Sequence, residues 1–181
     1  MKSLVAFAAV AAVSALSAPA FAQNLPLVGQ PSYTAGIGYA GVNIGSQDFG
    51  LLTVRARADF GKYVGIEGEG AFGFIDQSPV IGGVTVNEHV NDQYAAYLVA
   101  HYPVLQSANL FVRGGYGHTD FTASPTMAPK VRAGFDSWNY GAGGEYFWEK
   151  NGMRVEYTRM DYQDQGLRSA DTVSVSYVRK F

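Results

Sequence analysis

The chain has 181 residues, enough for one domain, and a formal net charge of −2 at pH 7. This slightly acidic balance argues against a nucleic-acid partner, because nucleic-acid-binding proteins need a stripe of Lys and Arg. The sequence contains no cysteine, so disulfides and thiolate metal sites are excluded.

The N-terminal residues predict export from the cytoplasm. Lys2 is followed by a mostly apolar run from Leu4 to Leu16 and then by Ala20-Phe21-Ala22. A basic start, a short apolar run and small residues at a cleavage site are typical of a secretory signal peptide, here residues 1–22. The run is too short to span a bilayer. The mature chain is expected to consist of a lead-in over residues 23–31 and one domain over residues 32–181.

Eight later segments alternate between apolar and polar side chains, and a period of two indicates β-strands. The predicted strands are 32–44, 50–60, 63–75, 92–102, 109–119, 135–148, 152–160 and 171–181. Short connections alternate with mostly longer, polar ones over 46–50, 76–91, 119–134 and 161–170. An even number of strands, with short turns at one end and long loops at the other, is typical of a transmembrane β-barrel. Both termini would then lie on the short-turn side.

The apolar face of these strands carries small aliphatic residues at the centres and aromatic residues near the ends. Rings at two levels are typical of side chains at the two headgroup layers of a membrane. Arg159 and Arg179 are the only charges predicted on this face, and each is close to a strand end, where a charge costs little. Because alternation does not reveal which face is inside, a periplasmic lipocalin-like barrel with an apolar interior is the alternative.

The last segment combines alternation with an aromatic final residue. Its apolar side carries Val173, Val175, Tyr177 and Phe181. It resembles the closing strand of Gram-negative outer-membrane barrels, in which the terminal aromatic residue is also an assembly signal. The resemblance therefore implies the barrel assembly machinery as a partner. Arg179 stands where that family usually has an apolar or aromatic residue.

The whole mature chain resembles the small OmpA/OmpX-type barrels and the opacity-protein-like barrels of the porin family. This resemblance implies an all-β fold, an eight-stranded antiparallel up-and-down transmembrane β-barrel. It also implies a place in the outer membrane with both termini in the periplasm, contact with outer-membrane lipid and lipopolysaccharide, and a monomeric state.

The polar face carries a set of charges predicted to form a network in the lumen. They are Arg55, Arg57, Asp59, Glu67, Glu69, Arg113, Glu145, Arg154 and Glu156.

Around the turn at Lys62, alternation sets Arg57 opposite Glu67 and Arg55 opposite Glu69, with Cβ atoms about 5 Å apart. Arg154 is expected to face Glu145 or Glu149, depending on the turn. An eight-stranded barrel is only just wide enough for its own side chains. Opposed charges therefore predict a plugged lumen, with a narrow gated ion channel as the alternative.

Catalysis and cofactors are not expected. Some small outer-membrane barrels modify lipid A, and they need a His and a Ser in a hydrolytic arrangement. The candidate is His118-Thr119-Asp120, but no Ser lies next to it and the His-x-Ser pattern is absent. His89, His101 and His118 are scattered, which argues against a zinc site. A lipid A-modifying enzyme is kept as the second alternative.

The segment 76–91 contains two short β-prone runs around Gly82-Gly83, which predict a type I′ hairpin. Such a hairpin would project beyond the membrane, where its edge can pair with a strand of a host or envelope protein. A solvated loop is the alternative. Together with a plugged lumen, the hairpin predicts a structural or surface-interaction role, in envelope integrity or in adhesion through the extracellular loops.

Overall fold

The computed structural model describes residues 31–44, 47–75, 80–81, 84–125, 131–163 and 169–181. The predicted signal peptide lies outside these residues. The strands are β1 (Ser32–Ile44), β2 (Gln47–Phe60), β3 (Val64–Ile75), β4 (Val80–Ile81), β5 (Val84–Pro103), β6 (Ala108–Pro125), β7 (Val131–Trp148), β8 (Asn151–Tyr162) and β9 (Ala170–Lys180). Within the described ranges, no helix is long and apolar enough to cross a membrane.

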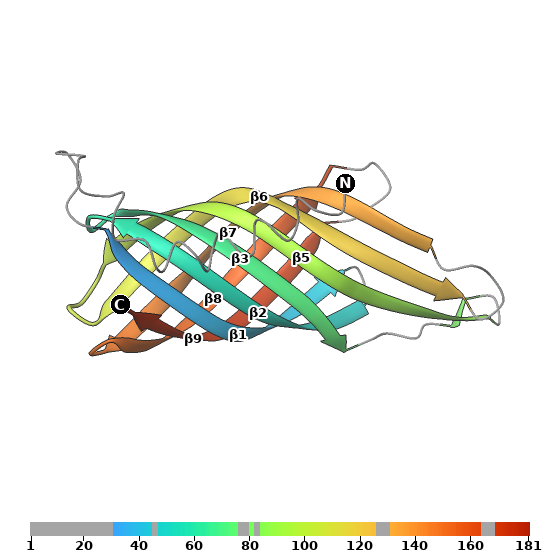
Figure 1. Ribbon diagram of the computed structural model, residues 1–181, viewed down its shortest axis with the longest axis horizontal. Coiled ribbons are helices and arrows are strands. Elements are labelled where there is room, and N and C mark those ends of the chain that lie inside the picture. Colours follow the sequence, from blue (N-terminus) through green and yellow to red (C-terminus); the bar gives the residue numbers. More distant parts are fainter. Residues whose placement is uncertain (1–30, 45–46, 76–79, 82–83, 126–130, 164–168) are drawn as a thin grey trace.

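Eight of these strands form a closed antiparallel barrel, as predicted (Figure 1). Each strand of the wall pairs with its neighbours in sequence, and β3 pairs directly with β5. Pairing of β1 with β9 closes the wall, with Ile37 opposite Tyr177. The turns after β2, β5 and β7 are at the same end of the barrel as the C-terminus, which we call the short-turn end.

The short strand β4 is an arm of a hairpin beside the barrel wall. Val80 lies opposite Thr85 and Ile81 opposite Val84 at the start of β5. This pairing leaves two residues between the arms, as the predicted hairpin requires. Gly82 and Gly83 themselves lie outside the described residues.

Five strands of the wall are longer than predicted, β2 and β8 by three residues each and β5, β6 and β7 by more. β5, β6 and β7 have 20, 18 and 18 residues, whereas the other wall strands have 11 to 14. The prediction that 47–49, 87–91, 120–125, 131–134 and 161–162 belong to connections was therefore wrong, whereas 84–86 were predicted as an arm of the hairpin. Beyond a membrane, a strand can be polar on both faces, so the alternation that marks membrane strands is lost there. The extra residues project at the end opposite the short turns, which we call the long-strand end (Figure 1).

The apolar face is the outer face of the barrel. Along β8, Arg154, Glu156 and Thr158 are buried, whereas Met153 and Val155 between them are exposed. An apolar exterior around a charged interior is typical of a transmembrane barrel and contradicts the lipocalin-like alternative.

Inward-facing glycines make room for large side chains on neighbouring strands. A Cβ atom at Gly143 would lie 2.6 Å from Cζ of Phe111. At Gly115 it would lie 2.0 Å from the carbonyl oxygen of Ala96 and 2.8 Å from Cδ1 of Tyr97. Because the interior of an eight-stranded barrel is narrow, small residues must face large ones for the lumen to be filled.

Candidate functional site

Four arginines and five carboxylates gather in the centre of the lumen. All of them occupy inward-facing positions of β2, β3, β6, β7 and β8, and their side chains are at most 12% exposed. They are Arg55, Arg57, Asp59, Glu67, Glu69, Arg113, Glu145, Arg154 and Glu156. We call this set the lumen network.

The register between β2 and β3 places Arg55 opposite Glu69 and Arg57 opposite Glu67. Arg55 Nη2 lies 2.9 Å from Glu69 Oε2. Arg57 Nη1, in contrast, lies 3.8 Å from Glu67 Oε2. The reason is that Arg57 reaches across the lumen and donates to both carboxylate oxygens of Glu145. The opposed positions follow from alternation, but the strongest partner of Arg57 comes from another strand.

Glu156 lies within ion-pair distance of Arg55, Arg113 and Arg154, and Glu67 also contacts three arginines of the lumen network. Arg154 donates to the two oxygens of Glu67 at 2.6 and 3.1 Å. Arg113 donates to the same carboxylate at 2.9 Å and to Glu69 at 2.9 Å. Such charge-assisted and bidentate hydrogen bonds are among the strong ones in proteins. Removing Glu67 would therefore take one of several carboxylate partners from each of two buried arginines.

Arg154 also connects the two strands of its own hairpin. It lies opposite Glu145 in the β7–β8 register, and its Nη1 is 3.2 Å from Glu145 Oε1. Of the two acids considered from the sequence, the structure thus gives Glu145 and not Glu149.

Aromatic rings cover the cations, a feature that the sequence analysis missed. The guanidinium carbon of Arg113 lies 3.9 Å from the ring centre of Tyr97, and that of Arg154 lies 4.0 Å from the ring centre of Phe111. Cation–π contacts of this kind are strongest where the cation is desolvated. The signal in the sequence was an aromatic residue at an inward position of one strand and a glycine at an inward position of the next, as for Tyr97 and Gly115.

An apolar layer lies between the lumen network and the long-strand end. Leu51 stands four residues beyond Arg55 on β2, and Met160 stands four residues beyond Glu156 on β8. The residues of this layer are at most 3% exposed: Ala40, Val42, Leu51, Ala71, Met160 and Ala170. Gln93 of the facing wall donates to Met160 Sδ at 2.9 Å. The layer lines the lumen along β1, β2, β3, β8 and β9, and a polar side chain of β5 contacts it from the facing wall.

His118, the histidine of the enzyme alternative, lies on β6 near the long-strand end. Its Nδ1 is 2.6 Å from Asp136 Oδ1, and its Nε2 is 3.5 Å from Asp120 Oδ1. Its ring stacks on Tyr94, with ring centres 5.3 Å apart. Both ring nitrogens thus face carboxylates. Among the described residues, no group of three or more His, Asp or Glu could hold a metal ion.

The two arginines predicted on the outer face have different surroundings. Arg159 Nε is 3.2 Å from Asp161 Oδ1, and its Nη1 is 3.3 Å from Asp171 Oδ1. Arg179 forms no ion pair with a carboxylate in the described part of the chain, and its guanidinium carbon lies 6.0 Å from the ring centre of Phe181.

A closed barrel with an apolar exterior and a charged interior defines a transmembrane β-barrel protein. The sequence profile described as "Outer membrane protein beta-barrel domain" matches residues 8–181. The chain therefore belongs to this family, and the family indicates the outer membrane as its location. Among curated protein sequences, none matches this chain significantly.

Several solved outer-membrane proteins have a similar fold. Ail, the attachment invasion locus protein of Yersinia pestis, has 15% identity and a TM-score of 0.60 over 83% of this chain and 97% of that chain. The N-terminal β-barrel domain of Pseudomonas aeruginosa OprF has 14% identity and a TM-score of 0.60 over 84% and 100%. Neisserial surface protein A has 8% identity and a TM-score of 0.59 over 83% and 97%. At these identities the likeness is one of fold.

Proposed function

We propose that the protein is a non-conducting, non-catalytic outer-membrane barrel with a structural and surface-interaction role. Its short-turn end, with the start of β1 and the end of β9, faces the periplasm, and the long strands β5, β6 and β7 face the outside of the cell. The observation that carries the proposal is the filling of the lumen by two successive layers, the lumen network and the apolar layer.

The two layers oppose ion flow in different ways. In the lumen network, the arginines and carboxylates neutralise one another, so that moving one side chain breaks several ion pairs at once. In the apolar layer, the buried side chains of Leu51 and Met160 narrow the lumen, and apolar constrictions close pores by excluding water. These features favour a plug over the gated channel.

The surroundings of His118 favour a barrel without hydrolytic activity. A hydrolytic His must direct one ring nitrogen to the nucleophile or to the attacking water, while the other is held by an orienting group. Here Asp136 and Asp120 occupy both directions.

A surface-interaction role is supported by the projecting strands. The β7–β8 pairing begins at Ser137 opposite Tyr162, and the carbonyl of Asp136 accepts the N–H of Gln163, so residues 131–135 of β7 pair along one side, with β6, among the described pairings. An open strand edge can accept an extended segment of another protein by β-augmentation. Ail, which has a similar fold, is named as an attachment protein and was crystallised with a heparin analogue. Adhesion is therefore the interaction proposed for this chain.

Planar-bilayer recordings test the plug. Refolded protein is expected to give no discrete current steps. The comparison is the double variant Leu51→Ser with Met160→Ser, which makes the apolar layer polar and so removes that barrier to ions. Discrete current steps from the unmodified protein would overturn the proposal.

The interaction role is tested with bacteria that express the protein on their surface. Prolines at both Ala133 and Gly134 remove at least one N–H from the open edge, because successive N–H groups of a strand point to opposite sides. Adhesion to host cells is expected to fall, with the heat-modifiable gel mobility of the barrel unchanged. Equal adhesion of both forms, or none by either, would contradict the role of this edge.

A further inference from the structure

The two arginines on the outer face differ in whether a carboxylate of the protein pairs with them. Arg159 has Asp161 and Asp171 beside it, and its Nη2 donates to Ser169 at 2.6 Å. Arg179 is at the other end of the barrel and has no carboxylate within ion-pair distance in the described chain. The protein therefore neutralises one membrane-facing arginine and leaves the other exposed and unpaired.

Arg179 stands on a surface of neutral side chains. On β9 it lies between the exposed rings of Tyr177 and Phe181. Across the sheet, its neighbours are Ala35 of β1 and Asn151 of β8. The Oδ1 atom of Asn151 already accepts a hydrogen bond from the Tyr177 hydroxyl. The surface next to the guanidinium thus provides rings and small side chains, and no described carboxylate lies within ion-pair distance of it.

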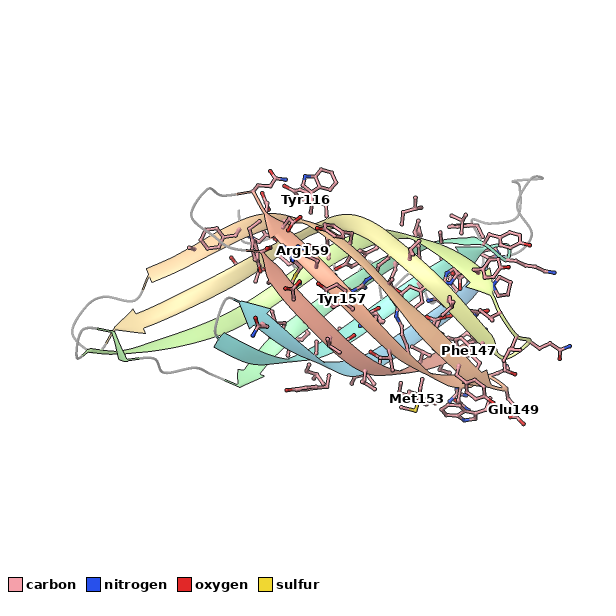
Figure 2. The ribbon with its side chains drawn as sticks, turned by 180° about the vertical axis from the view of Figure 1, so that it is seen from behind. Tyr116, Phe147, Glu149, Met153, Tyr157 and Arg159 are labelled. Carbon is pink, nitrogen blue, oxygen red and sulfur yellow. The ribbon has the colours of Figure 1, made fainter. Side chains whose placement is uncertain are left out.

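A second cation lies next to this strand end. The carbonyl of Lys150, in the turn after β7, accepts the N–H of Lys180 at 2.7 Å, which brings the turn against the end of β9. Lys150 is exposed, and so is Glu149 in the same turn, which forms no ion pair with either cation in the described chain. Figure 2 shows Glu149 at the tip of this turn, with Met153 on the wall nearby. Lys180 itself faces inward, with Nζ 3.6 Å from the ring centre of Phe147.

A charge on the outer face of a barrel is tolerated only at headgroup level, where it costs about 0–1 kcal/mol, against about 2–4 kcal/mol at the midplane. At that level, the anion that a membrane supplies is the lipid phosphate, which a guanidinium can bind through two parallel N–H groups. Aromatic rings such as those of Trp148 and Phe181 prefer the same level.

We propose that Arg179 binds the phosphate of an anionic phospholipid at the short-turn end of the barrel, and that the charge of Lys150 in the neighbouring turn adds to the attraction. Arg179 occupies a lipid-facing position in the alternation of β9, and this favours a lipid over a soluble anion. Only the choice of leaflet rests on the proposed function, because the proposed orientation of the barrel places the short-turn end at the periplasmic leaflet. The site itself depends only on the surface of the barrel.

The test uses refolded protein in nanodiscs that contain phosphatidylethanolamine with a minor fraction of phosphatidylglycerol. The protein is then released into detergent, and the lipids that stay bound are counted by native mass spectrometry. Each basic residue near an anionic lipid surface contributes about 1 kcal/mol, which corresponds to a factor of about five in the ratio of the two bound lipids. Arg179→Gln is therefore expected to lower the enrichment of phosphatidylglycerol about fivefold, and Arg179→Lys to keep most of it.

Arg159→Gln is the matched control, because it removes an outer-face arginine that already forms ion pairs with Asp161 and Asp171. Its phosphatidylglycerol enrichment is expected to equal that of the unmodified protein. Unchanged enrichment in Arg179→Gln, or an equal loss in Arg159→Gln, would overturn the site.

If Arg179→Gln does not refold, the same lipid enrichment is measured for Lys150→Gln, because Lys150 lies in a turn outside the wall. An enrichment about fivefold lower supports the site, and an unchanged one overturns it. Nanodiscs present the same lipids on both sides, so orientation does not affect the result. Conductance and adhesion are separate measurements, so the site and the proposed function can fail independently.

Discussion

The two faces of the same strands are built by different rules. On the inner face, large charged and aromatic side chains interlock with glycines, and the arginines of the lumen network are matched by carboxylates. On the outer face, side chains stand apart and are exposed, as Leu98 and Val112 are at 61% and 58%. A substitution should therefore have an effect set mainly by the face on which it falls, even between adjacent residues. The predictions below test this difference.

The largest effect is expected for Glu67→Ala, on the inner face. It removes one carboxylate from both Arg154 and Arg113, which keep Glu156 as a partner, so the expected loss is about 3 kcal/mol, the lower end of the range for breaking a buried ion pair. Urea unfolding of refolded protein in lipid vesicles measures the loss. Glu149→Ala, in an exposed turn, is the control and should stay within about 0.5 kcal/mol.

Double-mutant cycles sharpen this result. Glu67 should be strongly coupled to Arg154, whose two hydrogen bonds it accepts, and weakly to Arg57, which is 3.8 Å away. Independent sites add within about 0.3–0.5 kcal/mol. A larger coupling of Glu67 with Arg57 than with Arg154 would show that the cross-strand neighbour dominates after all.

The adjacent residues Gly114 and Gly115 give the most direct comparison of the two faces. A Cβ atom at Gly115 would lie 2.0 Å from the Ala96 carbonyl oxygen, a backbone atom, whereas one at Gly114 meets nothing within 4 Å. Gly115→Ala is expected to destabilise the barrel by about 1–3 kcal/mol through overpacking. Gly114→Ala should be neutral or stabilise it by up to about 1 kcal/mol, because alanine restricts the unfolded chain. Equal effects in urea unfolding would refute the distinction.

The smallest effect is expected for Arg159→Gln on the outer face. Arg159 is 39% exposed and its partners Asp161 and Asp171 are 46% and 43% exposed. Exposed ion pairs typically contribute about 0.2–1 kcal/mol. The same unfolding assay should show a loss in this range that shrinks in high salt. A loss as large as that of Glu67→Ala would mean that the outer face is as tightly constrained as the inner one.

The sequence predicted the strands of the barrel wall better than the side-chain contacts in the lumen. A period of two was enough for the fold, for the faces and for the register that sets Arg55 opposite Glu69. It could not give the contact of Arg57 with Glu145, because the strands that meet across a lumen depend on the tilt and stagger of the closed barrel. It also ended β6 too early and began β5 and β7 too late, since the alternation fades where no membrane lies against the strand.

The aromatic rings inside the barrel show a second limit. Tyr97 and Phe111 interrupt the polar face, and alternation alone gives no reason for their positions. Their reason is the cation that each covers and the glycine beside each, Gly115 and Gly143. The glycines were visible in the sequence, but their meaning depends on which strands are neighbours and in which register.

The long sequence separation of the partners in the lumen network has a consequence for how quickly the barrel forms and comes apart. Arg55 and Glu156 are 101 residues apart, Arg57 and Glu145 are 88, and Arg154 and Glu67 are 87. Each of these pairs joins an early strand to a late one, so the contacts are complete only when β1 meets β9. Interactions absent from the folding transition state change the unfolding rate and hardly affect the folding rate. We therefore expect the lumen network to slow unfolding and so to set the lifetime of the closed barrel, with little effect on the rate of its assembly.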